Sequence, residues 1–446
     1  MFKRAMGLTV AMLGMALTAP AVAQSAAVCR THGQAALEAW TQGRYDQVGK
    51  HFAPGIAAKL TPEMLRQVWG QVQTQAGSFK SLGALAPQSL GGQEVLVARM
   101  EFSRAALAAV IHCDAQDRID GFRVVPATLV EKATAAPEPA IPGAVSKALP
   151  VPTPLGALPG TLTLPEGSGP FPAVLLVAGS GPHDEDETVG PNKPFRDLAA
   201  GLAKAGIATL RYDKRTYVYG AQMAGKSITV DDEVTDDALA AARLLARQPG
   251  IDPHRVFVLG HSLGALMAPR IGQRDPHLAG LILLGAPASF GLDTLVRQMR
   301  YIGHLKDTPT AELDKELAPV IDARNAIAHA NPAKPPEGSF LHAPASYWLS
   351  LRDYNAVTVA KSLHMPMLVL QGGSDYQVTP KGDFVHWQTA FAHSKRVQLK
   401  EYPGLSHLFM PAGQPPSPAD LYKPGHVDAR VIGDVARWIK AQPAHS

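Results

Sequence analysis

The chain has 446 residues, of which 46% are hydrophobic and 18% are charged, and its formal net charge is +4. This composition excludes an intrinsically disordered chain, because the apolar side chains are numerous enough to form a large core. No basic run is interleaved with aromatic residues, which excludes the usual pattern of nucleic-acid binding. A chain of this length has room for two domains.

The first 23 residues have the pattern of a signal peptide. Lys3 and Arg4 precede an apolar stretch at 5–18, and residues 21–23 read Ala-Val-Ala, which fits an A-x-A cleavage site. The alternative is an uncleaved anchor, but the stretch is shorter than the roughly 20 residues that a spanning helix needs. We therefore expect an exported protein, periplasmic or secreted, without stable membrane insertion.

Residues 24–130 are predicted to form a small α+β domain. Two segments with helical periodicity are followed by three strand-like segments, a succession that is typical of such domains. The predicted helices cover residues 34–40 and 62–75, and the predicted strands cover 95–102, 107–113 and 119–125.

The two cysteines of the chain, Cys29 and Cys113, both fall in this domain. An exported protein meets oxidising conditions, so the sequence favours a disulfide between them. The alternative is a pair of buried free thiols. Neither cysteine belongs to a metal-binding or haem-binding pattern.

Residues 131–154 are rich in Ala and Pro, a composition typical of an extended linker. After it, from residue 155 to 446, strand-like and helix-like segments alternate, which predicts a mainly parallel, doubly wound sheet. Residues 287–364 break the alternation and are helix-like, so we expect a helical lid insertion there. The predicted strands cover 173–178, 207–212, 256–259, 278–284, 367–370 and 397–402, and the predicted helices 195–205, 231–247, 263–272 and 427–441.

Residues 260–264 read Gly-His-Ser-Leu-Gly, a G-x-S-x-G motif with Ser262 at its centre. The motif is weak by itself in a glycine-rich chain, but a predicted strand ends before it and a predicted helix follows it. That context indicates a sharp turn that presents a nucleophilic serine. The N–H of Leu263, at the start of the helix, is expected to face a developing oxyanion. The alternative is an ordinary glycine-rich turn.

A neutral serine needs a base, and chain order narrows the choice among 16 histidines. In proteins with this serine turn, an acid and then a histidine follow the serine along the chain. His407 lies just after the last predicted strand, and Asp375 follows the strand before it. We predict that Asp375 orients His407 as the base. The less favoured rivals are His364, His386 and Asp383.

The loop after the strand at 173–178 begins with small residues and continues with acids, reading GSGPHDEDE at 179–187. Small residues allow backbone N–H groups to approach a substrate carbonyl, so we expect the Ser180 N–H as the second oxyanion donor, with Gly181 next. His183 and the acids leave a metal site as the alternative, although such acids are more often solvated or paired with arginines. No metal or cofactor is predicted.

Four segments resemble the EstD-like esterase branch of the α/β-hydrolase superfamily: residues 174–217, GHSLGALMAPRI, LVLQGGSDYQV and GLSHLF. The resemblance covers the chain from about residue 151 to its end. It implies an α/β-hydrolase fold, hydrolysis of short-chain esters, and a triad at Ser262, Asp375 and His407. Residues 28–126 resemble the DUF3887 domain, a compact α+β module without established chemistry.

The sequence thus predicts a serine esterase that acts through an acyl-enzyme on a small-molecule ester. A serine aminopeptidase or a thioesterase of the same fold is the nearest alternative. An exported binding protein without catalysis is the alternative from another class. The sequence gives no indication of the oligomeric state.

Overall fold

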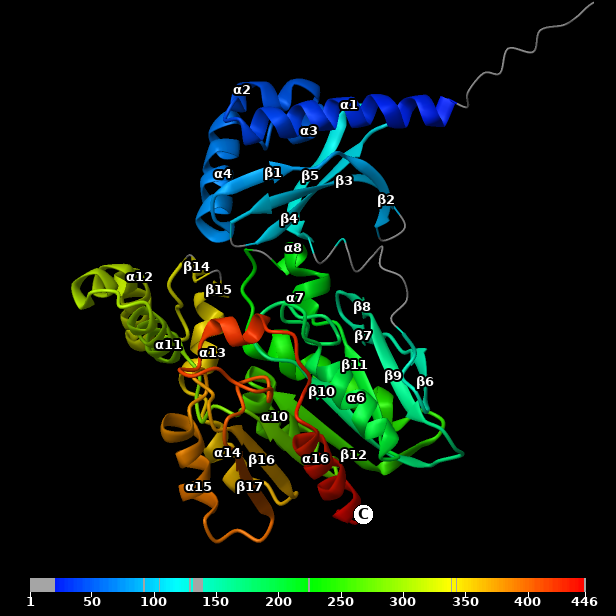
Figure 1. The fold of residues 1–446 in the computed structure, drawn as a ribbon, viewed down its shortest axis with the longest axis vertical. Helices are drawn as coiled ribbons and strands as arrows, with labels where there is room; N and C mark the ends of the chain where they lie inside the picture. The colour runs from blue at the N-terminus through cyan, green and yellow to red at the C-terminus, as the bar shows by residue number, and fades with distance from the viewer. Residues whose placement is uncertain are drawn as a thin grey trace, which may run out of the picture. The chain divides into compact units, whose positions relative to one another are not determined.

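The computed structural model describes residues 21–90, 93–103, 105–127, 130, 139–223, 225–337, 339–341 and 343–444. The predicted signal peptide falls almost wholly outside these ranges, and its last three residues begin helix α1 (Ala21–Thr41). The chain divides into two compact units, residues 1–139 and 140–446 (Figure 1).

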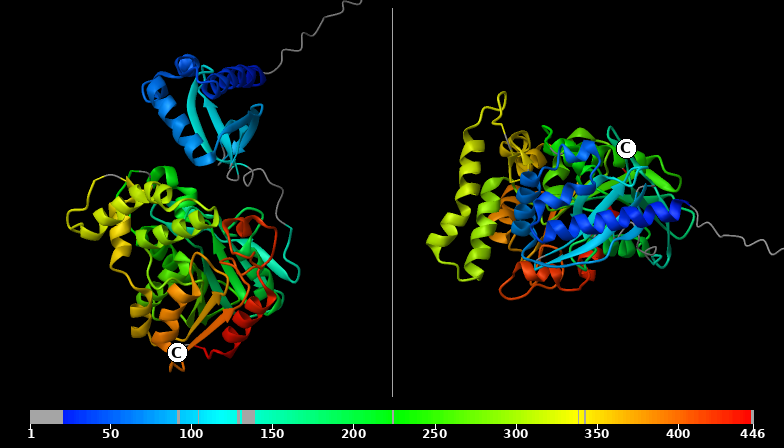
Figure 2. Two further views of the ribbon diagram at one scale, coloured as in Figure 1. Left: turned by 60° about the vertical axis from the view of Figure 1, so that its left-hand side comes forward. Right: turned by 90° about the horizontal axis from the view of Figure 1, so that it is seen from above.

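In the first unit, helices α1 and α4 (Pro62–Ala76) cover one face of an antiparallel sheet, and their apolar sides form its core (Figures 1 and 2). Helix α4 begins where its sequence favours a start, because Thr61 caps the Met64 N–H and a proline occupies the first helical position. The strands are β1 (Phe79–Leu82), β2 (Ala86–Leu90), β3 (Gln93–Phe102), β4 (Ala106–Cys113) and β5 (Ile119–Pro126), and the short helices are α2 (Tyr45–Val48), η1 (Gly49–His51) and α3 (Pro54–Ala57).

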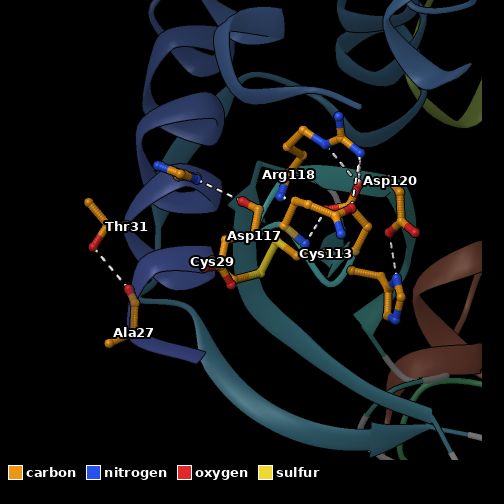
Figure 3. Close-up of a disulfide and its surroundings, with 11 residues drawn as sticks. Ala27, Cys29, Thr31, Cys113, Asp117, Arg118 and Asp120 are labelled. Atoms are coloured by element: carbon orange, nitrogen blue, oxygen red, sulfur yellow. Dashed lines mark hydrogen bonds and ion pairs between the residues drawn. A yellow bond between two sulfur atoms is a disulfide. The ribbon is translucent and has the colours of Figure 1, made fainter. Parts of the chain in front are cut away.

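Cys29 of α1 and Cys113 at the end of β4 form a disulfide, with their Cα atoms 6.0 Å apart (Figure 3). The bridge ties the helix to the sheet across 84 residues of chain. The likeness of this unit to the DUF3887 domain stays a prediction.

The second unit is built on a sheet with the strand order β17-β16-β13-β12-β10-β11-β9-β6. All neighbours from β17 to β11 are parallel, whereas β9 and β6 are antiparallel, so the predicted mainly parallel sheet is confirmed. The strands are β6 (Ala144–Ala148), β9 (Gly160–Pro165), β10 (Phe171–Val177), β11 (Ala208–Tyr212), β12 (Ile251–His261), β13 (Gly280–Leu284), β16 (Met367–Gly372) and β17 (Val397–Tyr402).

Helices cover both faces of this sheet (Figure 1). Along β10, Val174 and Leu176 pack against α6 and α16, while Ala173 and Leu175 face the opposite layer with α9 and α10. A strand buried on both sides reads as a continuous apolar run, which is why its sequence shows no alternation. The helices are α6 (Pro194–Lys204), α7 (Arg215–Val218), α8 (Gly220–Met223), η2 (Asp231–Thr235), α9 (Asp236–Ala246), α10 (Leu263–Arg274), η3 (Pro380–Phe384), α15 (Val385–Phe391), η4 (Pro418–Tyr422) and α16 (Ala429–Ala441).

The predicted linker at 131–154 is too long. Strand β6 lies within it and pairs with β9, and β7 (Val151–Thr153) forms a hairpin with β8 (Gly156–Leu158). Strand β6, at the edge of the sheet, contains no proline, and Pro152 lies in β7 of the separate two-stranded hairpin, so the prolines of this stretch do not interrupt the main sheet. Residues 131–138 lie outside the described ranges.

The insertion predicted at 287–364 folds as helices between β13 and β16. Helices α11 (Leu292–Leu305) and α12 (Thr310–His329) lie side by side (Figure 2), followed by a two-stranded pair and helices α13 (Ala345–Arg352) and α14 (Ala356–Ser362). The pair consists of β14 (Ser339–Phe340) and β15 (Ala343–Pro344). Within the described ranges, no helix has the length and hydropathy to cross a membrane.

Candidate active site

The predicted site residues all follow the carboxyl ends of parallel strands. Ser262 follows β12, Asp375 follows β16, His407 follows β17, and residues 179–181 follow β10. Since these strands run in the same direction, their carboxyl ends meet at one edge of the sheet, where sites of doubly wound folds assemble.

Ser262 occupies a strained turn between β12 and α10, with φ 52° and ψ −114°. Its backbone N–H donates to the Leu284 carbonyl at 2.9 Å, which holds the turn against β13. A Cβ on Gly260 would collide with the backbone of Gly264, and a Cβ on Gly264 would collide with the Val177 carbonyl. The two glycines of the motif are therefore required by close packing of the turn.

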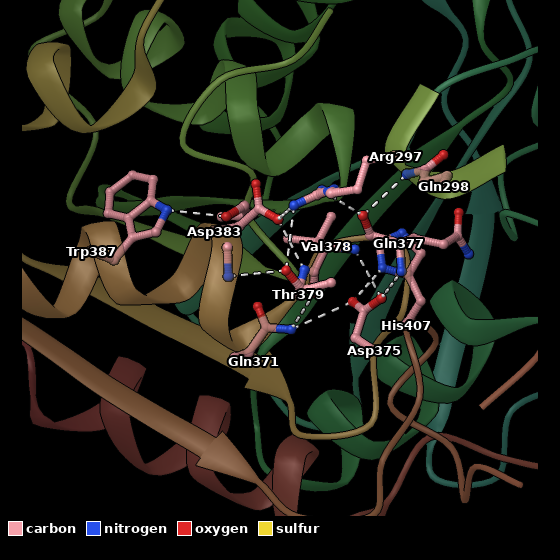
Figure 4. Close-up of polar contacts among 12 residues, drawn as sticks. Arg297, Gln298, Gln371, Asp375, Gln377, Val378, Thr379, Asp383, Trp387 and His407 are labelled. Atoms are coloured by element: carbon pink, nitrogen blue, oxygen red, sulfur yellow. Dashed lines mark hydrogen bonds and ion pairs between the residues drawn. The ribbon is translucent and has the colours of Figure 1, made fainter. Parts of the chain in front are cut away.

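His407 and Asp375 form a buried pair. The Nδ1 of His407 lies 2.6 Å from Oδ2 of Asp375, and the other carboxylate oxygen accepts the backbone N–H groups of Gln377 at 2.8 Å and Val378 at 3.0 Å (Figure 4). A carboxylate only accepts, so Nδ1 carries the proton of the neutral ring. Nε2 is then left with a lone pair that can take a proton from a serine hydroxyl.

Gly285, just beyond β13, makes room for this pair. It has φ +56°, and a Cβ there would lie 3.3 Å from Nδ1 of His407 and 3.5 Å from Oδ2 of Asp375. Ser262 is half-buried, while His407 and Asp375 are 5% and 3% exposed. The Ser262 side chain is thus partly accessible, whereas His407 and Asp375 are shielded from water.

The loop after β10 offers backbone donors. The Gly179 N–H is occupied, because it donates to Oε1 of Glu187 at 2.6 Å. Among the described residues, the N–H groups of Ser180 and Leu263 have no acceptor, so both are free for an incoming oxygen. Gly181 has φ +96°, a conformation that favours glycine and turns the loop.

The segment Arg-Tyr-Asp-Lys-Arg at 211–215 holds this loop in place. Arg211 pairs with Asp186, and Oδ1 of Asp213 accepts the Glu185 N–H at 2.7 Å. The Lys214 ammonium donates to the Gly179 carbonyl at 2.7 Å. Arg211, Asp213 and Lys214 therefore fix the loop that supplies the backbone donors.

The acidic side chains of the loop have protein partners. Asp184 accepts the Thr188 hydroxyl at 2.8 Å, and Glu187 binds His261. No group of three or more His, Cys, Asp or Glu side chains that suits a metal ion occurs in the part of the chain that the structure describes. Asp186 pairs with Arg211, as expected from the sequence for acids that are paired with arginines and do not bind a metal.

The rival residues lie elsewhere. His364 and His386 are exposed, and His386 belongs to helix α15. Sequence reasoning missed Glu187, His261, Lys214 and Gly285. The position of His261 next to Ser262 in the motif was the only indication in the sequence that it belongs to the site. Its partner Glu187 lies 74 residues earlier in the chain, and nothing in the sequence indicated that the two side chains meet.

A serine on a strained strand–helix turn, followed by acid and base loops on a doubly wound sheet, defines an α/β-hydrolase. The chain is 33% identical over 384 residues to esterase EstD of Thermotoga maritima, covering 86% of this chain and 89% of the relative. It belongs to the EstD family of α/β-hydrolases and is a hydrolase of the esterase type. The aligned length exceeds the second unit, so the match extends into the first unit.

Further comparisons find a family model and less similar proteins. Residues 192–411 match the family described as serine aminopeptidase, S33. An uncharacterized protein of Mycobacterium tuberculosis, Rv2307c, is 25% identical over 53% of this chain and 63% of its own length. A hyperthermophilic esterase from Pyrobaculum calidifontis aligns with a TM-score of 0.44 at 16% identity, over 67% of this chain and 85% of that one.

Proposed function

We propose that the chain is an exported serine carboxylesterase that cleaves short-chain carboxylic esters through a Ser262–His407–Asp375 triad. The observation that carries this proposal is the buried 2.6 Å contact of His407 with Asp375, combined with the strained turn that presents Ser262. A strained, half-buried serine and an oriented imidazole at the same edge of the sheet are the groups that nucleophilic catalysis needs.

In the proposed reaction, Ser262 attacks the ester carbonyl and His407 accepts its proton. The N–H groups of Leu263 and Ser180 receive the oxyanion, with Gly181 as the neighbouring donor. His407 then protonates the leaving alcohol, and an acyl-enzyme remains on Ser262. Water, activated by His407, releases the acid, and Asp375 stabilises the imidazolium at both steps.

The ester class is favoured by the relative, which is named an esterase. Short acyl chains are the expectation from the resemblance of the motifs. The test is hydrolysis of p-nitrophenyl esters of increasing acyl length by the mature chain, with Ser262→Ala as the matched variant. Turnover of short esters by the wild type and loss in the variant support the proposal. A wild type that neither hydrolyses esters nor reacts with a fluorophosphonate contradicts it.

Export is favoured by two independent features, the signal-peptide pattern of residues 1–23 and the disulfide of the first unit. Fractionation of the producing cells, with N-terminal sequencing of the product, tests it. A mature protein that begins at Gln24 outside the cytoplasm supports export. A full-length cytoplasmic product with reduced cysteines contradicts it.

An aminopeptidase is the second candidate, favoured by the family match at 192–411. Such an enzyme needs a group that binds a free amino terminus. The acids on α12 do not provide one, since Glu312, Asp314 and Glu316 are exposed and Asp314 pairs with Arg300 at 2.9 Å. Aminoacyl p-nitroanilides, assayed beside the esters, decide between the two activities.

A further inference from the structure

His261, the residue before Ser262, has an acceptor at each ring nitrogen. Its Nδ1 lies 2.9 Å from Oε1 of Glu187, and its Nε2 lies 2.9 Å from the backbone carbonyl oxygen of His407. A carbonyl oxygen and a carboxylate only accept hydrogen bonds. Both ring nitrogens must therefore carry a proton, which makes His261 an imidazolium.

We propose that Glu187 and His261 are positioning residues of the esterase reaction. They form a buried carboxylate–imidazolium pair that holds the loop after β10, which carries Ser180, and the loop after β17, which carries His407, in place around Ser262. This inference rests on the proposed function and extends it to residues outside the triad. Neither residue touches the reacting atoms, so the pair acts through Gly179, Ser262 and His407.

The hydrogen bonds form one chain through the site. The same Oε1 of Glu187 that accepts from His261 also accepts the Gly179 N–H at 2.6 Å, and the Gly179 carbonyl accepts from Lys214 at 2.7 Å. Gly179 is thereby fixed at both its backbone groups. The next N–H along the chain, that of Ser180, is the proposed oxyanion donor.

The other end of the chain reaches the base. His261 donates to the His407 carbonyl, and the centroids of the two rings are 4.6 Å apart. His261 is also bonded covalently to Ser262. A displacement of the His261 ring would thus shift the nucleophile, the base and the oxyanion donor together, and small displacements of such groups slow catalysis strongly.

The surroundings favour the charged pair. Burial opposes ionisation of both groups, but their mutual attraction and hydrogen bond outweigh it, raising the pKa of His261 and lowering the pKa of Glu187. The other charged or titratable groups that act on the pair are Asp375 and His407 beside His261, and His183 beside Glu187, with Lys214 bound to the same Gly179. Glu187 itself has φ 52°, a conformation costly for a residue with a side chain.

Glu187→Gln tests the pair with little change of shape. The amide oxygen can still accept from Gly179, but the charge that keeps the second proton on His261 is gone. A neutral ring has only one N–H, so it can donate either to the amide oxygen of the variant or to the His407 carbonyl, and at the other contact two acceptors repel. We expect kcat on a p-nitrophenyl ester to fall about 100-fold with little change in KM.

Asp237→Asn is the matched control, because Asp237 forms a buried ion pair with Arg215 on α7 and its side-chain hydrogen bonds go to Arg215. It should lower the melting temperature without lowering kcat. Glu166→Gln, at an exposed position of the same unit, controls for loss of one negative charge, and it too should keep kcat.

Nitrogen-15 NMR of the histidine rings supplies a readout that does not depend on activity. In the wild type at neutral pH, one buried histidine should show two protonated ring nitrogens, and this signal should be absent from His261→Asn and replaced by a neutral ring in Glu187→Gln. A neutral His261 in the wild type overturns the inference, as does a Glu187→Gln enzyme with wild-type kcat. If the wild type hydrolyses no ester, the proposed function fails and the positioning role with it, while the NMR result still decides the charge of His261.

Discussion

Asp375 and Asp383 follow the same strand, yet only Asp375 contacts His407. Asp383 accepts from Arg297 of helix α11 at 2.8 Å and from the Thr379 N–H at 2.9 Å, as Figure 4 shows. Arg297 also donates to the Gln377 carbonyl at 3.0 Å. The second acid therefore anchors the insertion to the loop that carries the first.

Exchange of each acid for its amide separates these two tasks. Asp375→Asn presents an N–H to His407 and favours the wrong tautomer, so kcat should fall about 10⁴-fold. Asp383→Asn should leave kcat near the wild-type value and lower the free energy of unfolding by about 1–3 kcal/mol, since Arg297 loses its ionic partner. Ester kinetics and thermal melts of both variants check this. A larger loss of kcat in Asp383→Asn than in Asp375→Asn would contradict the assignment of Asp375 as the acid that orients His407.

The serine turn has no room for a methyl group at Gly264. Its Cβ would meet the Val177 carbonyl, which belongs to the sheet and cannot move aside. Gly264→Ala should therefore yield little folded protein, or a fold without esterase activity. Gly433→Ala is the control within the same unit, because its Cβ would meet only the flexible end of Arg437. That variant, in the interior of α16, should be as stable as the wild type or more stable by up to about 1 kcal/mol.

The disulfide should stabilise the first unit alone. Its loop of 84 residues restricts the unfolded chain strongly, and Cys29→Ser with Cys113→Ser should cost about 2–5 kcal/mol. Differential scanning calorimetry should show one transition moving to lower temperature. Because every residue of the candidate site belongs to the second unit, kcat should not change. A fall in kcat at a temperature where the variant is folded would show that the first unit contributes to catalysis.

The Glu187–His261 pair predicts how stability depends on pH. His261 has a raised pKa, so its contribution is complete below its ordinary value of 6.5 and is lost as the pH rises through the folded-state pKa. Glu187 has a lowered pKa, so its contribution is complete above 4.5 and is lost as the pH falls through the folded-state pKa. Both contributions are complete only between these two values.

The difference in melting temperature between the wild type and Glu187→Gln should therefore be largest between pH 4.5 and 6.5. In this pH range we expect the variant to lose about 3 kcal/mol of unfolding free energy, the usual cost of breaking a buried ion pair. The loss should be smaller at lower and at higher pH. Thermal melts of both proteins across the pH range measure it. A difference that grows above pH 6.5 would show that His261 is not the partner.

Most elements of the second unit follow from sequence patterns. Apolar runs predicted β10 and β13, and the amphipathic pattern of residues 231–247, with its acidic start, predicted the helix that includes α9. Strands β6 and β9 escaped prediction; β6 is the edge strand of the sheet, pairs on one side only and is mostly exposed, so it lacks a buried apolar run. In the first unit β1 and β2 were missed for a related reason, as short strands carry too little periodicity.

The order of Ser262, Asp375 and His407, each just after a parallel strand, was readable from the sequence, because parallel strands bring their carboxyl ends to one edge whatever the details of packing. Two things needed the tertiary structure: which of two nearby acids reaches His407, and that Glu187 meets His261 across 74 residues. Those contacts depend on side-chain directions at loop ends and on the exclusion of water from the pair. Such quantities are set by packing between distant segments, and no local pattern of residues records them.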